Sequence, residues 1–454
     1  MTDITAEALS SRISGRVLEG EEAVQASRPW NHSYSNHSAL VAFPNNAEEV
    51  ASCVAFAAEN RLPIGVQCTG HGVVRSVAGG LLIMTTGLTD LEVDVEARTA
   101  RIGAGLEWAP VIAATEGHGL SSLHGSSPFV GAVGYTVGGG MGWLGRKHGL
   151  QSESVISFQV VTPDGVLRTA SADENPDLFW ALRGAGGGSL GVITEMTIHL
   201  VPVTEVYAGN LYYPAADAHE VIAMFAAWCE KLPEEMTAAI VLQNFPNLDS
   251  VPEHVRGKSF AIIRGAWCGP LSEGAALVDR LRQQKEPVID HFGPLPWTEC
   301  AKISNDPIGP VTLHNMSECL TSLDPDVAEV LVARTFPPEG HPRVTQTEAR
   351  ICGGALERGD GPATRGLATS PYTLVVIGPH HPETPDLLPD YLAAFRQDLA
   401  PHVTGHAYPN FMDGPERAER SSHIFTDEDW QRVQAVKAET DPRNAFRYGV
   451  DLKS

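Results

Sequence analysis

A histidine flanked by glycines, in the segment Thr69-Gly70-His71-Gly72, limits what this chain can fold into more than any other short segment. The apolar run at residues 62–67 just before it predicts a strand. Glycine lacks the Cβ atom that would keep a bulky ligand away from the backbone. The segment therefore predicts a strand ending in a ligand-binding loop, where the histidine could be a base, a metal ligand or a covalent anchor.

A strand–helix–strand unit precedes this loop. Residues 40–43 and 64–66 predict its strands, and Asn46 followed by Glu49 resembles a capping box at the start of the helix between them. Further elements follow the loop. They are strands at 81–84 and 99–102, a hairpin of 155–161 and 166–169, a helix at 178–183 that breaks at the glycine-rich residues 184–188, and a strand at 190–200. This order predicts a mixed α/β lobe.

The sequence changes character beyond about residue 206. Glycine-rich phosphate loops are absent there, and helices alternate with strand-like runs. The expected helices are 221–232 and 273–284, and the expected strands are 239–242, 260–263 and 372–377. We predict a separate α+β substrate domain, and the proline- and glycine-rich stretch 336–371 predicts a mobile cover.

Composition excludes several classes of function. The 454 residues carry a formal net charge of −23, which would repel a nucleic-acid backbone. No apolar stretch reaches the ~20 residues of a membrane span, and the amino terminus lacks a signal pattern. The seven cysteines form no CxxC pair, which argues against a zinc site or a disulfide framework. We expect a soluble cytoplasmic protein with reduced cysteines, without a nucleic-acid or membrane partner.

Two segments, residues 140–145 and 186–191, match the pattern GxGxxG. A Rossmann nucleotide site needs this pattern after a strand and at the start of a helix, whose amino terminus then faces the pyrophosphate. Residues 186–191 instead follow a helix and precede a strand. The order of elements therefore argues against a nicotinamide-type site and leaves several glycine loops that could lie along one extended ligand.

Four segments together give the chain a family resemblance. They are Thr69-Gly70-His71-Gly72; residues 124–140, which begin His124-Gly125-Ser126-Ser127 and end Gly138-Gly139-Gly140; residues 177–184 with Gly191-Val192-Ile193-Thr194; and Tyr408-Pro409-Asn410-Phe411 followed by Val436-Lys437 and residues 441–444. In this order and spacing the chain resembles the FAD-linked oxidases of the vanillyl-alcohol-oxidase superfamily, in their berberine-bridge-enzyme-like branch.

The resemblance implies an α+β fold of two domains. A two-lobed FAD-binding domain of the PCMH type would occupy residues 1–205, with its core at about 38–203. An antiparallel sheet flanked by helices would form the substrate domain over 206–400. Residues 401–454 would return to the FAD domain.

The resemblance also implies a covalent cofactor. The histidine matching His71 bonds to the 8α-methyl group of FAD in this family, and a neutral imidazole is a suitable nucleophile. Many members carry a cysteine at the position of Ser127 and form a second bond to the flavin. A serine hydroxyl offers no thiolate-like nucleophile at neutral pH. We therefore expect a single linkage, through His71.

The expected FAD contacts follow from motif position. They are Thr69, Gly70, His71, Gly72, Val73, Ser127, Val130, Gly131, Gly134, Gly138, Gly139, Gly140, Val192, Tyr408 and Asn410. Members that react with dioxygen tend to carry valine at the position of Val130. The resemblance therefore favours an oxidase that produces hydrogen peroxide.

The sequence does not identify a single catalytic base. The tyrosine that serves as the base in much of this branch is replaced by Phe411, which has no exchangeable proton. Tyr408 and Tyr135 are the predicted catalytic candidates. His124, Tyr372, His380 and His381 are further polar candidates, and the spacing of the two adjacent histidines indicates no metal site.

We expect an enzyme that oxidises a small organic metabolite, such as an amine or a phenol of secondary metabolism. One alternative is a flavin-scaffold cyclase or isomerase with little net oxidation, and another is a carbohydrate oxidase. A purely structural or binding role is a third alternative. The identity of the substrate and the oligomeric state stay open.

Overall fold

A computed structural model describes residues 4–338, 344–379 and 387–452. The first of three main sheets has the order β1–β2–β4–β3. Its strands are β1 (Arg16–Leu18), β2 (Leu40–Phe43), β4 (Leu81–Met84) and β3 (Ile64–Gln67). Both β2 and β3 run parallel to β4. The predicted strand–helix–strand unit is therefore present, with β4 inserted between its two strands.

Helix α3 (Ala47–Asn60) connects β2 to β3, and its cap differs in part from the expected one. The Asn46 side chain accepts a hydrogen bond from the backbone N–H of Glu49 at 2.9 Å, as a capping residue should. The Glu49 carboxylate does not return to Asn46. It accepts hydrogen bonds from the backbone N–H groups of Ser14, Gly15 and Asn45, and so fixes the chain just before β1.

The second sheet is antiparallel and has the order β5–β6–β10–β8–β9. Its strands are β5 (Leu91–Asp94), β6 (Thr99–Gly103), β8 (Val155–Val161), β9 (Leu167–Ser171) and β10 (Val192–His199). The predicted hairpin is confirmed as the β8–β9 pair. Strand β5 was not predicted, because it contains only two apolar residues and exposes Glu92 and Asp94.

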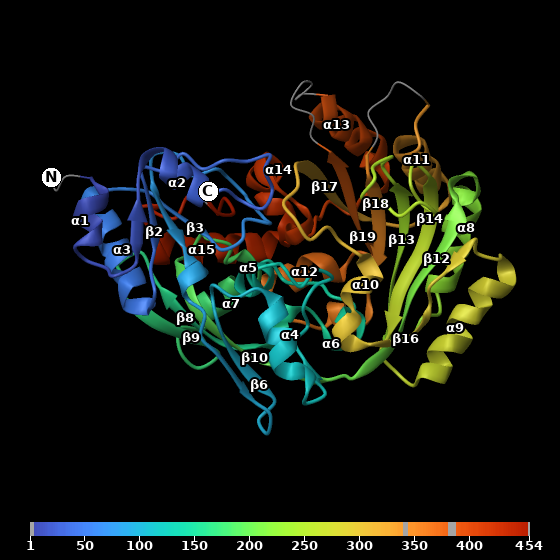
Figure 1. Cartoon of the computed structure of the whole chain (residues 1–454), viewed down its shortest axis with the longest axis horizontal. Coiled ribbons are helices and arrows are strands. Elements are labelled where there is room, and N and C mark those ends of the chain that lie inside the picture. The colour runs from blue at the N-terminus through green and yellow to red at the C-terminus, as the bar shows by residue number, and fades with distance from the viewer. Residues whose placement is uncertain (1–3, 339–343, 380–386, 453–454) are drawn as a thin grey trace.

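Short helices surround these two sheets (Figure 1). They are α1 (Ala6–Ser10), α2 (Gly20–Ala26), α4 (Trp108–Glu116), α5 (Ala132–Val137), α6 (Gly145–His148) and α7 (Pro176–Ala185). Two short strands, β7 (Leu120–Ser121) and β11 (Val201–Pro202), pair with each other. The chain then passes into the third sheet.

The third sheet has eight antiparallel strands, in the order β15–β12–β14–β13–β18–β19–β17, with β16 also paired to β12. The strands are β12 (Glu205–Pro214), β13 (Met236–Asn244), β14 (Ser259–Trp267), β15 (Ile289–Asp290), β16 (Gly293–Pro296), β17 (Leu313–Leu320), β18 (Gln346–Ile351) and β19 (Tyr372–Pro379). With its antiparallel sheets and helices, the chain has the predicted α+β class.

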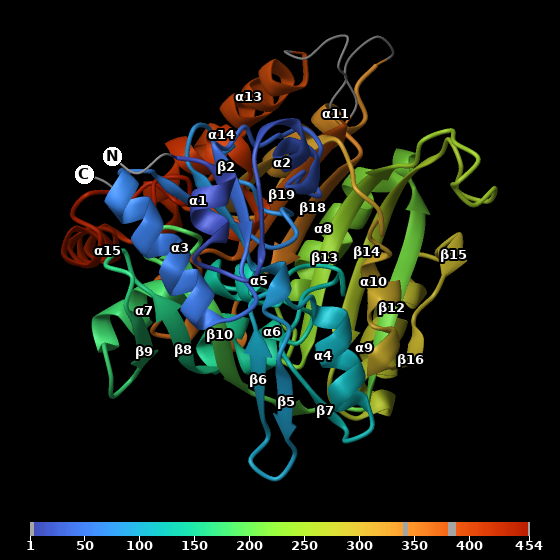
Figure 2. The ribbon, with the colours of Figure 1, turned by 60° about the vertical axis from the view of Figure 1, so that its left-hand side comes forward.

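Helices cover one face of this large sheet. They are α8 (Ala218–Cys229), α9 (Leu271–Gln284), α11 (Pro325–Thr335) and α13 (Leu387–Leu399). Together with the sheet they enclose one hydrophobic core. The opposite face looks toward the amino-terminal sheets, with α10 (Ala301–Ser304) and α6 between them (Figures 1 and 2).

The prediction of a mobile cover at 336–371 was wrong for the described residues of this stretch, 336–338 and 344–371. Strand β18 lies in this stretch and pairs with β13 on one side and β19 on the other. Ala349 and Ile351 are buried in the core beneath the helices. The polar residues that alternate with them obscured the apolar pattern. The glycine- and proline-rich part that follows forms a short 3₁₀ turn and helix α12 (Pro362–Ala368).

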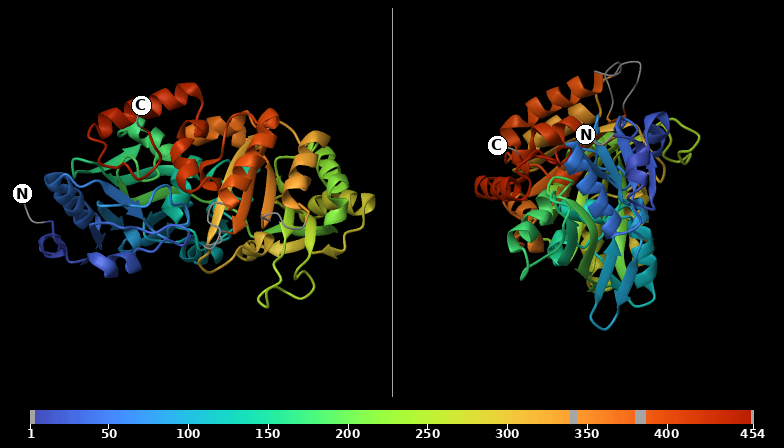
Figure 3. Two further views of the ribbon diagram at one scale, coloured as in Figure 1. Left: turned by 90° about the horizontal axis from the view of Figure 1, so that it is seen from above. Right: turned by 90° about the vertical axis from the view of Figure 1, so that its left-hand side faces the viewer.

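The carboxyl-terminal segment crosses back to the first two sheets (Figure 3). It contains α14 (Gly414–Glu419) and α15 (Asp427–Thr440), and α15 packs against α7. The buried Lys437 holds this return in place, because its Nζ donates to the carbonyl oxygens of Ser189 and Phe446 and pairs with Asp441 at 2.7 Å. Within the described ranges, no helix has the length and apolar character needed to cross a membrane.

Candidate functional site

The histidine loop follows β3 and is locked against the chain that precedes β2. The His71 ring stacks on Trp30 with 4.1 Å between ring centroids, and its Nδ1 lies 2.8 Å from the Thr69 hydroxyl. Gly70 has φ +76°, and a Cβ atom there would lie 2.5 Å from Cβ of Pro29, so only glycine fits. Burial lowers the pKa of His71 to about 4. The imidazole is therefore neutral at physiological pH.

A second glycine loop, at residues 138–141, is held by the carboxyl-terminal segment. The Tyr408 hydroxyl accepts a hydrogen bond from the backbone N–H of Met141 at 2.6 Å. The Asn410 side-chain amide donates to the Tyr408 hydroxyl at 3.2 Å and to the carbonyl of Tyr135 at 2.8 Å. A Cβ atom at Gly138 would lie 1.9 Å from Oδ1 of Asn410. Residues more than 250 positions further along the chain thus fix the conformation of this loop.

Neither predicted tyrosine has the environment of a proton acceptor. Burial raises the pKa of Tyr408 to about 12, even though two donors face its hydroxyl. Burial also raises the pKa of Tyr135 well above its ordinary value. The Tyr135 hydroxyl donates to the carbonyl of Leu123 at 3.4 Å. Its ring packs against Gly140, where a Cβ atom would lie 2.6 Å from the ring. Both hydroxyls stay protonated at neutral pH and support the loops.

The other predicted contacts differ in their surroundings. Gly131 lies against the histidine loop, because a Cβ atom there would lie 3.3 Å from Sγ of Cys68 and 3.6 Å from Oγ1 of Thr69. A Cβ atom at Gly134 would have no neighbouring atom within 4 Å. The hydroxyl of Ser127 accepts from the N–H of Phe129 at 3.4 Å. The remaining residues differ in exposure: Gly72 is exposed, Gly139 is buried, Val73 and Val130 are half-buried, and Val192 is fully enclosed in the hydrophobic core.

Sequence analysis missed a row of charged residues on the inner face of the large sheet. Arg264, Glu348 and Arg350 come from β14 and β18 and are each at most 5% exposed. Glu348 pairs with Arg350 at 2.6 Å and with Arg264 at 3.3 Å. Both arginines lie opposite Ala239 of the strand between them, so the register places them side by side. The alternation Gln346, Glu348, Arg350 was the available signal.

Phe411 belongs to the surroundings of this row. The Arg350 guanidinium lies 4.3 Å from the ring centroid of Trp143 and 5.7 Å from that of Phe411. An arginine that stacks on aromatic rings gains cation–π stabilisation and keeps its charge. The position where related enzymes carry a tyrosine base is therefore an apolar support for a buried cation here.

Asp306 is a carboxylate near the same row. It accepts a hydrogen bond from the Ser126 hydroxyl at 2.7 Å. The residue is exposed to solvent. Desolvation raises the pKa of its carboxyl group, and the hydrogen bond from Ser126 and the charges of Arg264 and Arg350 oppose that rise. Ser126 precedes Ser127, the position of the second flavin bond in related enzymes. The carboxylate is thus tied to the loop expected to face the flavin.

The remaining polar candidates have structural roles or fall outside the description. His124 is buried, burial lowers its pKa to about 4, and its Nδ1 lies 2.9 Å from the carbonyl oxygen of Gly125. Tyr372 lies on β19, and burial raises its pKa. His380 and His381 lie outside the described residues. No group of three potential metal ligands forms within the described part of the chain.

These features fit an extended dinucleotide such as FAD. Two loops with left-handed glycines, Gly70 and Gly139, are fixed by distant residues and leave backbone without side chains. A neutral imidazole stands on one of them. A buried arginine, Arg417, lies beside Gly72 with an Nε atom that has no partner within the described residues.

Several known proteins are similar to this chain in sequence and in fold. The FAD binding domain family matches residues 38–171. An FAD-linked oxidoreductase of Dictyostelium discoideum is 25% identical over 93% of this chain and 90% of its own length. The (R)-6-hydroxynicotine oxidase of Paenarthrobacter nicotinovorans is 26% identical over 93% of both chains. The crystal structure of 6-hydroxy-D-nicotine oxidase from Arthrobacter nicotinovorans, at 21% identity, superposes with a TM-score of 0.85 over 100% of this chain and 99% of that one.

The fold, the paired glycine loops and these relatives define an FAD-dependent oxidoreductase. Within that class, the sequence motifs and the fold are similar to those of the vanillyl-alcohol-oxidase superfamily with a PCMH-type FAD-binding domain, in its berberine-bridge-enzyme-like branch.

Proposed function

We propose that this enzyme oxidises a small organic metabolite with FAD tethered through His71 alone, and that dioxygen is the electron acceptor. The observation that carries this proposal is the neutral imidazole of His71 on a glycine loop that is rigidly held by Trp30 and Thr69. A neutral imidazole has the lone pair that a covalent bond requires. Ser127 provides no second nucleophile.

The arrangement of parts supports the same proposal. Residues 1–205 with the returning segment 401–454 would hold FAD, and the sheet of residues 206–400 would cover the substrate side. FAD supplies the two-electron acceptor for the substrate hydride when it is bound. Related members that react with dioxygen tend to carry valine at the position of Val130, which supports dioxygen as the electron acceptor. Its two-electron, two-proton reduction gives hydrogen peroxide.

The protein groups would bind the substrate and take its proton. Both tyrosine hydroxyls are protonated and engaged, so we propose that Tyr408 and Tyr135 position the glycine loop. Asp306 is the carboxylate best placed to accept an O–H or N–H proton, because it stands beside Ser126 and has a raised pKa. The ion-paired Arg264, Glu348 and Arg350 would orient a polar group of the substrate.

A nitrogen-containing or phenolic metabolite is the substrate class that we favour. A relative aligned over 93% of the chain is named as a 6-hydroxynicotine oxidase, whose substrate is a hydroxylated amine. The absence of the tyrosine base at Phe411 also argues against a carbohydrate, whose hydroxyl needs a strong base.

An oxygen-electrode screen of the yellow purified protein tests this proposal. Amines, phenols, polyketide-like compounds and sugars are added in turn, and hydrogen peroxide is assayed in parallel. We expect oxygen uptake with stoichiometric peroxide for an amine or a phenol. Turnover of a substrate without oxygen uptake would identify a cyclase or an isomerase, and uptake with sugars alone would identify a carbohydrate oxidase.

A further inference from the structure

Arg417 is a buried cation that interacts with the Asp413 carboxylate only through space and forms no direct ion pair with it. It lies on the short helix α14 and is 4% exposed. Its Nε is buried without a hydrogen-bond partner, and its guanidinium forms no ion pair with a described residue. A buried charge without a partner is strongly unfavourable, so proteins normally retain one only where a ligand or an ion completes the site.

The other buried cations of the described chain have partners. Arg146 donates to backbone carbonyls, Arg183 pairs with Glu153, Arg264 and Arg350 pair with Glu348, and Lys437 pairs with Asp441. Arg417 therefore departs from the pattern in the rest of the described structure. Burial lowers its pKa to about 10, which still leaves it protonated at neutral pH.

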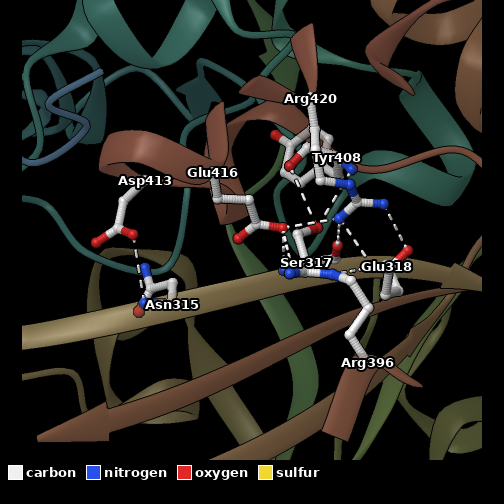
Figure 4. Close-up of polar contacts among 8 residues, drawn as sticks. All are labelled: Asn315, Ser317, Glu318, Arg396, Tyr408, Asp413, Glu416 and Arg420. Carbon is white, nitrogen blue, oxygen red and sulfur yellow. Dashed lines mark hydrogen bonds and ion pairs between the residues drawn. The ribbon is translucent and has the colours of Figure 1, made fainter. Parts of the chain in front are cut away.

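The carboxylates nearest along the helix are engaged elsewhere (Figure 4). Glu416 pairs with Arg396 and with Arg420, the latter at 2.9 Å. The Asp413 carboxylate accepts hydrogen bonds from the backbone N–H of Asn315 and from the side chain of Asn31. Burial raises the pKa of Asp413 to about 7, so it carries only part of a negative charge at neutral pH. Glu416 is therefore engaged elsewhere, and Asp413 supports the charge of Arg417 through space without a direct ion pair.

The guanidinium lies where two glycine loops meet. A Cβ atom at Gly72, directly after His71, would lie 3.3 Å from Nη1 of Arg417. A Cβ atom at Gly187, in the loop between α7 and β10, would lie 3.2 Å from Nη2. Glycine at both positions leaves the two terminal nitrogens bordered by bare backbone, where an anion can approach without meeting a side chain.

We propose that Arg417 binds the diphosphate of FAD, and that Gly72 and Gly187 are glycines so that the phosphate oxygens can reach it. The diphosphate of FAD is negatively charged at neutral pH. It would therefore compensate the positive charge of the buried guanidinium, which is protonated at that pH. The planar fork of arginine donates two parallel hydrogen bonds to phosphate oxygens. The proposal rests on FAD as the cofactor and is independent of the tether at His71.

Reversible flavin binding tests this assignment. In a His71→Ala background, FAD and riboflavin are titrated separately into the apoprotein and their fluorescence quenching is recorded. Riboflavin has the same ring system without the diphosphate. We expect Arg417→Gln to weaken FAD binding about ten- to a hundred-fold and riboflavin binding by less than about two-fold. Arg417→Lys should lose less, because it retains the charge but lacks the fork.

Arg420→Gln is the matched control, since Arg420 lies three residues along the chain and pairs with Glu318 and Glu416. It should change the affinities for FAD and riboflavin by the same factor. Equal losses for both flavins in Arg417→Gln would place the guanidinium against the ring system and overturn the proposal, as would unchanged FAD affinity. Failure of the parent apoprotein to bind FAD would contradict the cofactor assignment itself.

A variant that fails to fold does not remove the test. Circular dichroism and thermal unfolding identify that case, and the salt dependence of the folded Arg417→Lys and parent proteins then decides. Ion pairing to a diphosphate predicts that FAD affinity falls with increasing sodium chloride while riboflavin affinity does not. An FAD affinity that is insensitive to salt in both proteins would contradict the proposal.

Discussion

In the proposed enzyme, two individual residues would determine how the flavin is attached. His71 is neutral because burial lowers its pKa to about 4, and its orientation is fixed by Trp30 and Thr69. In the proposed tether, these contacts would orient the imidazole for bond formation. Ser127 is half-buried on its loop and offers a hydroxyl where related enzymes offer a thiol. The number of covalent bonds should therefore depend on these two residues.

The tether can be counted by mass. We expect the parent protein to carry the mass of one FAD after denaturation, and His71→Ala to carry none. The double variant His71→Ala, Ser127→Cys should regain acid-stable flavin, because a thiol of pKa ~8.5 supplies thiolate at neutral pH. Intact mass spectrometry in acid measures all three. Flavin retained by His71→Ala alone would show that another residue forms the bond.

Among the elements, strand β18 shows what the sequence pattern could and could not reveal. The strand–helix–strand unit, the β8–β9 hairpin and the kinked α7 were predictable, because apolar periodicity and turn residues mark them locally. Strand β18 was predicted as part of a loop, because Glu348 and Arg350 alternate with its apolar residues. Their charges are satisfied by each other and by Arg264 on β14. Such cross-strand partners depend on register, which one strand's sequence does not contain.

Asp306, in the loop between α10 and β17, has a testable role as the catalytic base. We expect Asp306→Asn to slow anaerobic flavin reduction about 10²- to 10⁴-fold with the substrate found in the oxygen screen. A base must be deprotonated, so the parent rate should fall as pH decreases through the raised pKa of Asp306. Stopped-flow absorbance against pH measures this, and the variant should lack the acidic limb. Ser126→Ala should only shift the limb upward, because the hydrogen bond that it removes lowers the pKa. An unchanged limb in Asp306→Asn would exclude Asp306 as the base.

At the scale of the whole molecule, the site is assembled from three distant parts of the chain. The histidine loop, the glycine loop at 138–141 and the segment from Tyr408 to Arg417 meet because residues 401–454 cross back to the first sheets. The motifs indicated that these parts belong together. They could not indicate the buried hydrogen bond from Lys437 to the carbonyl of Ser189, since its two groups lie 248 positions apart in the sequence.

Lys437 anchors the returning segment from a buried position. Its ammonium group is buried, pairs with Asp441 and donates to Ser189 and Phe446. Lys437→Met would leave the buried Asp441 carboxylate unpaired, so we expect the free energy of unfolding to fall by about 3–5 kcal/mol. Urea unfolding measures it. Lys302→Met is the control, because Lys302 pairs with Glu299 on the exposed surface and should cost less than about 1 kcal/mol. Since the returning segment also carries Tyr408 and Asn410, the flavin of the Lys437 variant should become exposed to solvent at lower urea concentrations than that of the control. Flavin fluorescence measures this exposure, and equal exposure in both variants would separate the cofactor site from this anchor.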